Sequence, residues 1–496
     1  MACALPEITP LERPAYQRAV RLLLRHPLVT ESYPDGDALA LLRRWAAHLR
    51  ADLADQLGYR VEITATTARL IRTADTLDPS RPARPRPDSD RTFDRRRYAY
   101  LALALAALGR SGGQIALGEL ATAVAADAAR VDGLGLSTQS ASDRAAFVDA
   151  IAWIETRGGL RLADGNARRW ADDPDRAEAL YDVDRDVIGA TYRPSRVLQH
   201  VRSVDALLHR SDSASRDPRR REAAQRARRA VIETPVAYYA DADADMANML
   251  RTSSLVSDVE RLTGCPVERR AEGLALLDTT QRFSDLPFPS GGTVPQAALL
   301  LAGAIADRIT DPDQPAPTRL PEPGPAAATA EVAAQIDLGL PVAGILTELA
   351  EPATTPAAAL HAAGPDGVDD ARPEHPLLQR AWLRTTMLAL GDRYGPAFSA
   401  RWRADPERLL GAALDLLADL RMVAVVEGGV LALPLLARYR NTVATLKRRP
   451  SLLDGALFDL GAGGTHDETD DGADNWADDR ADNGYAAARG QDGAGE

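Results

Sequence analysis

A serine between glycines is the first feature of the sequence that suggests chemistry. The run Gly109-Arg110-Ser111-Gly112-Gly113 matches the G-x-S-x-G pattern of serine hydrolases, in which a sharp turn from a strand to a helix exposes the serine. The preceding residues, 95–108, are rich in Ala and Leu and predict a helix instead. Because glycine commonly ends helices, we interpret the run as a helix stop and expect no enzyme activity. A hydrolase that uses Ser111 is kept as an alternative.

Metal and cofactor sites are equally poorly supported. Asp241, Asp243 and Asp245 resemble the start of a calcium loop, but Met246 stands where a glycine is needed and Thr252 where a glutamate is needed. The seven histidines include no pair three or four residues apart, and two cysteines provide neither a four-ligand zinc site nor a disulfide framework. We expect helix capping by these aspartates, and no metal or cofactor.

Lysine is almost absent from the sequence. Lys447 is the only one, so 58 of the 59 basic residues are arginine. A phosphate-binding P-loop needs a lysine after a glycine-rich turn, and the surroundings of Lys447 do not provide this turn. The chain is therefore not expected to be a P-loop ATPase or a Schiff-base enzyme.

Two arginine clusters are the strongest candidates for binding. Residues 81–97 hold seven Arg and three Asp, and residues 216–229 hold seven Arg, one Asp and one Glu. Guanidinium groups bind phosphate oxygens in pairs and give salt-dependent, sequence-independent affinity, although a solvated helix face is the alternative for each cluster. The candidate DNA-contacting residues are Arg95, Arg96, Arg97, Arg219, Arg220, Arg221, Arg226, Arg228 and Arg229.

The predicted helices and strands around these residues follow a repeated order: helix, short strand, two helices and a two-stranded hairpin. This is the order of a winged helix. The hairpins are expected at 160–162 with 179–183, at 266–270 with 274–278, and at 422–426 with 430–433. The predicted fold is mainly α with small β-hairpins (α+β). The predicted parts are an N-terminal helical and strand unit (1–78), winged helices at 91–190, 216–310 and 373–446, a Pro/Ala-rich linker (311–372) and a disordered acidic tail (461–496).

The third helix of each predicted winged helix is the one that reads DNA bases in many such domains. Residues 142–157, 253–263 and 406–420 carry as many acidic as basic residues or more. A helix in the major groove lies between two rows of phosphates, so this balance disfavours base reading. Protein docking or nonspecific DNA contact is favoured.

An apolar stripe in the N-terminal unit predicts an interface. It consists of Leu39, Leu42, Trp45, Leu49 and Leu53. A pair of helices followed by a strand pattern at 59–71 does not bury such a stripe by itself, so it packs on a winged helix or on a second copy of the chain. A homodimer is expected, with edge strands paired across a two-fold axis.

Charge and length limit the class of protein. The 496 residues carry a net charge of −12, and residues 461–496, with ten acidic residues against two Arg, contribute −8 of it. The longest apolar run, 297–306, is half of the roughly 20 residues that a membrane span needs, and no signal peptide is recognised at the start. We expect a soluble, cytoplasmic protein without membrane contact.

Several spaced strings carry a family resemblance. They include Phe93-Asp94-Arg95-Arg96-Arg97-Tyr98 and Phe288-Pro289-Ser290-Gly291-Gly292-Thr293, together with residues 114–124, 267–273, 296–301 and 420–439. Over residues 12–446 the chain resembles the MukE-like subunit of the Wadjet anti-plasmid defence system. The resemblance implies a KITE protein, a tandem winged-helix subunit that dimerises, binds a kleisin-like partner and joins an SMC-type ATPase complex on double-stranded DNA. A winged-helix transcriptional regulator is the alternative.

Overall fold

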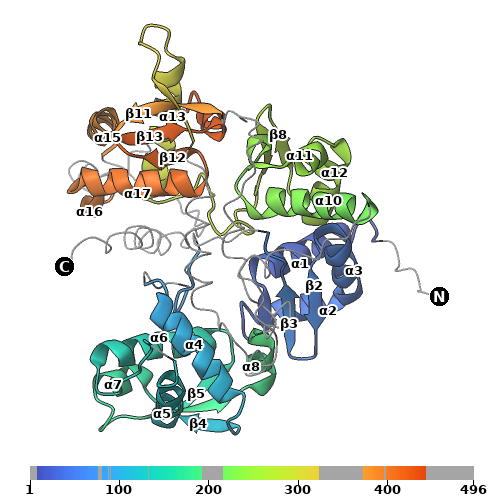
Figure 1. Ribbon diagram of the computed structural model, residues 1–496, viewed down its shortest axis with the longest axis vertical. Helices are drawn as coiled ribbons and strands as arrows, with labels where there is room; N and C mark the ends of the chain where they lie inside the picture. The colour runs from blue at the N-terminus through green and yellow to red at the C-terminus, as the bar shows by residue number, and fades with distance from the viewer. Residues whose placement is uncertain are drawn as a thin grey trace, which may run out of the picture. The chain divides into compact units, whose positions relative to one another are not determined.

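A computed structural model describes residues 8–75, 81–192, 216–322 and 373–442, apart from 88, 90, 132, 396 and 397. Within these residues the chain is α+β and consists of repeated winged helices, as predicted, joined in tandem (Figure 1). Four copies of the motif are present in the described residues, one more than the sequence indicated. The predicted disordered tail at 461–496 and most of the linker at 311–372 lie outside them.

Copy 1 is the N-terminal unit, which is itself a winged helix. Its elements are α1 (Arg13–Arg25), β1 (Leu28–Thr30), α2 (Ala38–Arg44), α3 (Ala46–Leu57), β2 (Arg60–Ile63) and β3 (Thr67–Ile71). The short strand β1 pairs with β3, so that Leu28 lies opposite Arg69 and Thr30 opposite Thr67. This pairing supplies the third strand that the sequence reasoning did not find.

Copy 2 has the largest wing. It contains α4 (Arg95–Leu108), β4 (Gln114–Ala116), α5 (Leu117–Ala128), α6 (Ala141–Thr156), β5 (Leu160–Gly165), α7 (Ala167–Asp172), β6 (Ala179–Val183) and α8 (Arg185–Thr191). Side-chain caps start α4 and α6: Asp94 accepts from the Arg97 amide and Ser140 from the Asp143 amide. The hairpin partners β5 and β6 are those expected from the sequence.

Copy 3 begins with its longest helix. Its elements are α10 (Arg216–Glu233), β7 (Ala237–Tyr238), the 3-10 turn η2 (Tyr239–Asp241), α11 (Ala244–Leu250), α12 (Ser253–Thr263), β8 (Val267–Arg269) and β9 (Gly273–Leu276). Asp243 accepts a hydrogen bond from the Met246 amide at 2.9 Å, so it caps α11. Its core is a few aliphatic side chains, among them Val231, Val259 and Leu274.

Copy 4 is assembled from two separated stretches of chain. It contains α13 (Thr293–Thr310), β10 (Arg319–Pro321), β11 (Glu374–Gln379), α15 (Arg380–Tyr394), α16 (Ala400–Arg403), α17 (Pro406–Asp419), β12 (Val423–Val426), β13 (Gly429–Ala432) and the 3-10 helix η5 (Pro434–Tyr439). Residues 374–379, at the start of the predicted winged helix 373–446, form a strand because they pair with β13, with Leu377 opposite Leu431.

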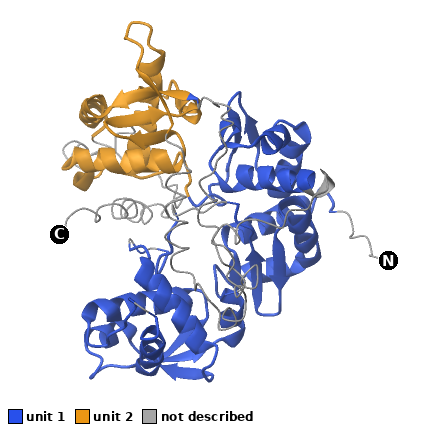
Figure 2. Ribbon diagram, in the orientation of Figure 1, with its two compact units in different colours: residues 1–285, 323–373 blue, residues 286–322, 374–496 orange. Residues whose placement is uncertain are grey.

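Helix α13 belongs to copy 4, although the sequence reasoning placed residues up to 310 with copy 3. Its fully buried side chains Ala297, Leu301 and Ile305 pack among α15, α17 and η5. At its start, the Thr293 hydroxyl accepts a hydrogen bond from the Ser399 amide at 3.0 Å. Residues 286–322 accordingly form one compact unit with residues 374–442, whereas copies 1 to 3 form the other (Figure 2).

All four sheets have the same strand order. The first strand of each copy pairs with the last, and the last pairs with the middle one, in the orders β1-β3-β2, β4-β6-β5, β7-β9-β8 and β11-β13-β12, with β10 added beside β11. No described helix has the length and apolar character that a membrane span needs.

Copy 1 holds both of its neighbours in the first unit. The Gln17 amide donates to the Arg261 carbonyl at the end of α12 (2.9 Å), and Leu262 completes the core of copy 1. On the other side, the Thr30 hydroxyl donates to the Arg157 carbonyl at the end of α6 (3.1 Å). Gly158 allows this approach, because its φ is +78° and a Cβ there would lie 2.6 Å from the Ser32 hydroxyl oxygen.

Replacing Gly158 with alanine is therefore expected to destabilise the contact between copies 1 and 2. The left-handed backbone costs roughly 1 kcal/mol for a residue with a Cβ, and the steric overlap adds about 1–3 kcal/mol. Gly133→Ala is the matched control, since Gly133 also has a positive φ (+72°) but no atom within 4 Å of an added Cβ. Urea unfolding should show the larger loss for Gly158→Ala, and equal losses would contradict the packing described.

Candidate nucleic-acid interface

The first arginine cluster is largely paired with the recognition helix of its own copy, the third helix α6. Arg97 lies between Asp94 and Asp149, with nitrogen–oxygen distances of 2.7 and 2.8 Å, and its side chain is only 13% exposed. Arg96 pairs with Asp143 at 2.7 Å. These arginines therefore fasten α4 to α6, and the acidic residues that made α6 look unsuited to DNA are their partners.

The second cluster has the same internal use. Arg229 is 3% exposed, and its guanidinium donates to both carboxylate oxygens of Asp75 and to the Leu57 carbonyl (2.6 Å). Arg228 pairs with Asp258 on α12 at 2.7 Å. These residues bind α10 to copy 1 and to its own recognition helix.

Two further members of this cluster are paired at the surface. Arg226 pairs with Asp243 and Arg221 with Asp55, each at 2.8 Å. The Arg221 pair lies in solvent, since the two side chains are 62% and 60% exposed. Surface pairs of this kind stabilise a protein by less than about 1 kcal/mol.

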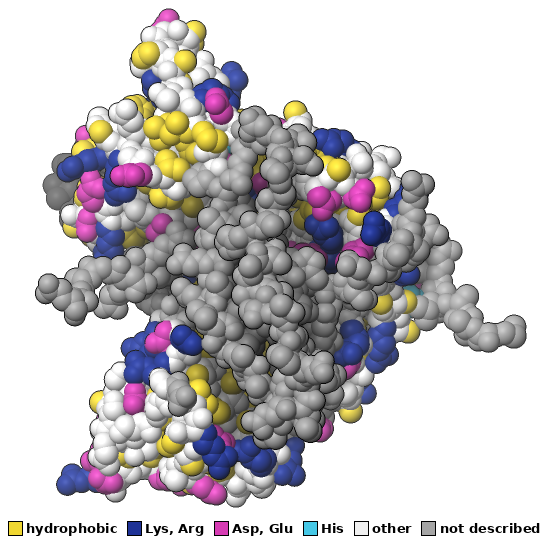
Figure 3. All heavy atoms as spheres, viewed as in Figure 1, with side chains coloured by type: hydrophobic (Ala, Val, Ile, Leu, Met, Phe, Trp, Pro, Cys, Tyr) yellow, Lys and Arg dark blue, Asp and Glu magenta, His cyan; other side chains and the backbone are white. Residues whose placement is uncertain are grey.

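Three of the nine candidate arginines remain available to a ligand. Arg95, in the first turn of α4, and Arg219 and Arg220, near the start of α10, are exposed and form no ion pair with any described residue. In the space-filling view, arginines and acidic residues alternate on the visible face (Figure 3). The interface that the arginines can offer is therefore two small patches at helix starts instead of two continuous stripes.

The recognition helices of copies 3 and 4 are neutralised in the same way as α6. Asp258 on α12 accepts from Arg228 and Arg261, and the Glu260 carboxylate accepts from the Val267 amide at 2.9 Å. Glu407 on α17 pairs with Arg384 of α15 at 2.7 Å. The acids of the third helices thus bind neighbouring elements of their own domains.

The repeated arrangement extends over the part of the chain that matches a known family, residues 20–442. The chain belongs to the DUF2398 family. The description of the family is a protein of unknown function. No match to the chain is found among curated proteins or among solved structures. The DUF2398 match starts within α1 and ends after η5, so all four winged helices fall within it, the first lacking only its opening residues.

The apolar stripe of this DUF2398 protein is internal core and not an exposed interface. Leu39, Leu42, Trp45, Leu49 and Leu53 are at most 5% exposed, and all belong to the core of copy 1. The expectation that a second copy covers them was wrong, because it was based on a unit of only two helices and a strand pattern. Helix α1 and strand β1 complete the domain, and their side chains cover the stripe.

The residues weighed for catalysis occupy structural positions. Ser111 follows helix α4 and precedes strand β4, the reverse of the order that a nucleophile elbow needs, and its hydroxyl donates to the Leu108 carbonyl at 2.9 Å. Among the described residues there is no group of three or more His, Cys, Asp or Glu side chains that could hold a metal ion.

Sequence reasoning overlooked two exposed arginines in the wing of copy 2. Arg168 and Arg169 lie on α7, which is inserted between β5 and β6 and is capped by Asn166. Two adjacent arginines could have indicated a basic site, but Asp172 and Asp173 follow them closely, so the segment does not stand out as a basic cluster. The wing, residues 160–183, holds four Arg and six acidic residues, so it adds no basic patch.

Arg229 and Arg221 provide a test of the difference between buried and exposed pairs on one helix. Arg229→Ala leaves Asp75 without its partner and should lower the free energy of unfolding by about 2–4 kcal/mol, because a partly buried carboxylate loses its counter-charge. Arg221→Ala, the control, should cost less than about 1 kcal/mol. Urea denaturation followed by circular dichroism measures both. A stable Arg229→Ala protein would show that this cluster is not structural.

Proposed function

We propose that this protein is a non-catalytic, KITE-type subunit of a condensin-like SMC complex that acts in defence against plasmids. It binds a kleisin-like subunit, reaches the SMC-type ATPase through that subunit, and contacts double-stranded DNA without sequence preference. The observation that carries the proposal is the tandem of winged helices with charge-neutralised recognition helices. The resemblance to the MukE-like subunit of the Wadjet system implies a tandem of this kind.

Neutral recognition helices favour a complex subunit over a transcriptional regulator. A regulator reads bases with free polar or basic side chains on the third helix. In α6 the charged residues Asp143 and Asp149 are held by Arg96 and Arg97, and in α12 Asp258 is held by Arg228. Because these acidic side chains already form ion pairs within their own domain, the surfaces of the recognition helices carry little free charge. Such surfaces favour docking of a protein partner over base reading.

The exposed arginines fit nonspecific contact with DNA. Arg95, Arg219 and Arg220 occupy the starts of the first helices in two copies, where unpaired backbone amides and the helix dipole also favour phosphate. Contacts of this type neutralise phosphates without reading bases. A homodimer stays part of the proposal, and strand β2, an edge strand of its sheet, is the element available for pairing across a two-fold axis.

Removal of the three exposed arginines should weaken DNA binding uniformly. In Arg95→Ala/Arg219→Ala/Arg220→Ala, we expect affinity to fall on the order of tenfold at low salt for every duplex, and the slope of log affinity against log salt to become shallower by about 2 to 3. Fluorescence anisotropy with unrelated duplexes measures both quantities.

The matched control removes the same charge from arginines that already have partners. Arg130, Arg161 and Arg176 are 81–88% exposed and pair with Asp127, Asp182 and Asp173. Their triple alanine variant should retain most of the affinity. Equal losses in both triple variants would show that only net charge matters, and tight binding of one short sequence by the unmutated protein would favour a regulator.

Complex formation tests the proposed partner directly. On co-expression with a kleisin-like chain encoded in the same gene neighbourhood, the protein should elute with it as one species containing two copies of this chain. Size-exclusion chromatography with light scattering gives the stoichiometry. A protein that stays monomeric at tens of micromolar and forms no complex with that chain would refute the KITE proposal.

A further inference from the structure

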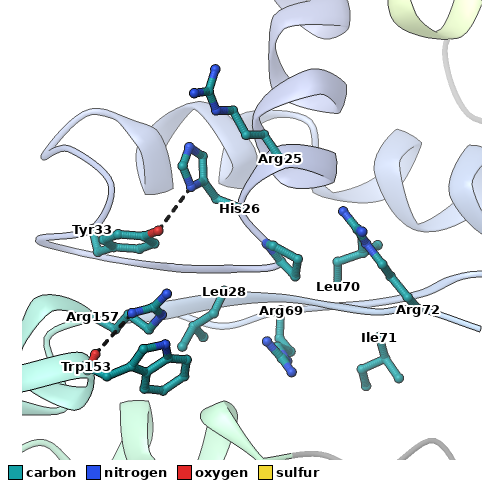
Figure 4. Close-up of a pocket in the computed structure, with 11 residues that line it drawn as sticks. Arg25, His26, Leu28, Tyr33, Arg69, Leu70, Ile71, Arg72, Trp153 and Arg157 are labelled. Atoms are coloured by element: carbon teal, nitrogen blue, oxygen red, sulfur yellow. Dashed lines mark hydrogen bonds between the residues drawn. The ribbon is translucent and has the colours of Figure 1, made fainter. Parts of the chain in front are cut away.

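A positively charged pocket lies between copies 1 and 2, within one compact unit. It has a volume of about 490 Å³, in the range of small-molecule sites. Four arginines line it: Arg25, Arg69 and Arg72 from copy 1 and Arg157 from the end of α6 (Figure 4). None of them belongs to either arginine cluster.

Two of these arginines form no ion pair within the described residues. Arg72 pairs with Glu233 at 3.7 Å, and Arg25 donates to the Arg282 carbonyl. Arg69 and Arg157, in contrast, form no ion pair with any described residue, and the buried Nε of Arg69 has no hydrogen-bond partner. Glu62, opposite Arg69 on β2, pairs with Arg60 at 3.4 Å and offsets the charge of Arg69 only in part. A half-buried donor without an acceptor is costly, because it loses its solvation.

The two unpaired arginines also act on each other. The pKa of Arg157 is lowered, first by burial and also by the charge of Arg69, while Tyr33 opposes the shift. Burial lowers the pKa of Arg69 too, the neighbouring Arg72 adds to the effect, and Glu62 opposes it. Both groups stay charged at neutral pH, so like charges are held together in a half-buried site.

Rigid contacts hold this arrangement in place. The Arg157 guanidinium lies 3.7 Å from the centre of the Trp153 ring and donates to the Trp153 carbonyl at 3.2 Å. Figure 4 shows Arg69 and Trp153 on the same side of strand β3, and Arg72 on the other. The indole Nε1 of Trp153 is a second buried donor without an acceptor. The pocket is therefore lined by four arginines and by no acidic residue, and two of its donors have no acceptor.

We propose that this pocket binds a phosphate group, held between the guanidinium groups of Arg69 and Arg157. Guanidinium forks match phosphate oxygens in geometry and charge, and a dianion supplies the ion pair that neither arginine forms within the described residues. The phosphate comes from a small molecule or from a DNA backbone. Because the two arginines belong to different copies, the bound group also ties α6 to strand β3.

Pyrophosphate titration tests the site without DNA or a partner chain, so its result is independent of the proposed SMC function. Using the full chain, thermal unfolding and isothermal titration are recorded with sodium pyrophosphate against sodium chloride at matched ionic strength. Saturable binding that stabilises the protein is expected, and Arg69→Met and Arg157→Met should each weaken it at least tenfold. Arg176→Met, at an exposed arginine of copy 2, should leave it unchanged.

The ligand-free variants separate binding from structural support. Arg69→Met should be at least as thermally stable as the unmutated protein, because it removes charge repulsion and keeps an apolar side chain of similar length. An arginine with only a structural role would instead lower the melting temperature when replaced. If Arg69→Met does not fold, Arg157→Met still provides the titration. Absence of saturable binding, or equal binding by both variants and the unmutated protein, would overturn the proposal.

Competition with DNA identifies the source of the phosphate. If a short duplex and pyrophosphate exclude each other and Arg69→Met weakens both, the site holds a backbone phosphate. If both bind at once, the site serves a small phosphorylated molecule. Either result supports a phosphate site and states which ligand it takes.

Discussion

The antiparallel pairing between the first and last strands of each winged helix is the interaction on which the rest of the structure depends. A two-stranded hairpin is marginally stable alone, so each wing needs a third strand. That strand comes from between the first two helices, and its pairing wraps all three helices around one face of the sheet. In copy 4 the partners of α13, among them α15 and α17, follow β11 and begin more than 60 residues later in the chain. The same constraint made copy 1 a complete domain and buried its apolar stripe.

Arginine forms the ion pairs that connect these helices to one another. Arg97 connects the first and third helices of copy 2, Arg228 does the same in copy 3, and Arg229 connects copy 3 to copy 1. A chain with a single lysine has only this side chain for such contacts, and its planar fork suits paired carboxylate oxygens. Arg95, Arg219 and Arg220 at the starts of α4 and α10, and Arg69 and Arg157 in the pocket beside α6, form no such pair, so they are the proposed ligand contacts.

The sequence predicted those elements of the fold that depend on residues close together in the chain. The hairpins of copies 2, 3 and 4 were recognisable from alternating residues around glycine turns, and the mainly helical α+β class followed. Strand β1 has only three residues, too few to show a period, and residues 374–379 became a strand only through pairing with β13. The placement of α13 depends on partners across a long insertion, which no local pattern records. Of the nine arginines chosen from clustering, most have partners far away in sequence: Asp143 lies 47 residues from Arg96, and Asp75 lies 154 from Arg229.

The chain folds into four winged helices, and a long insertion splits the last one. Hydrogen exchange measured by mass spectrometry across a urea series tests this arrangement most directly, because segments of one domain lose protection at the same urea concentration. Residues 293–310 should lose protection at the same urea concentration as 374–379 and 406–419, and at a different concentration from 216–276. Opening of 293–310 together with 216–276, or an unprotected strand at 374–379, would contradict it.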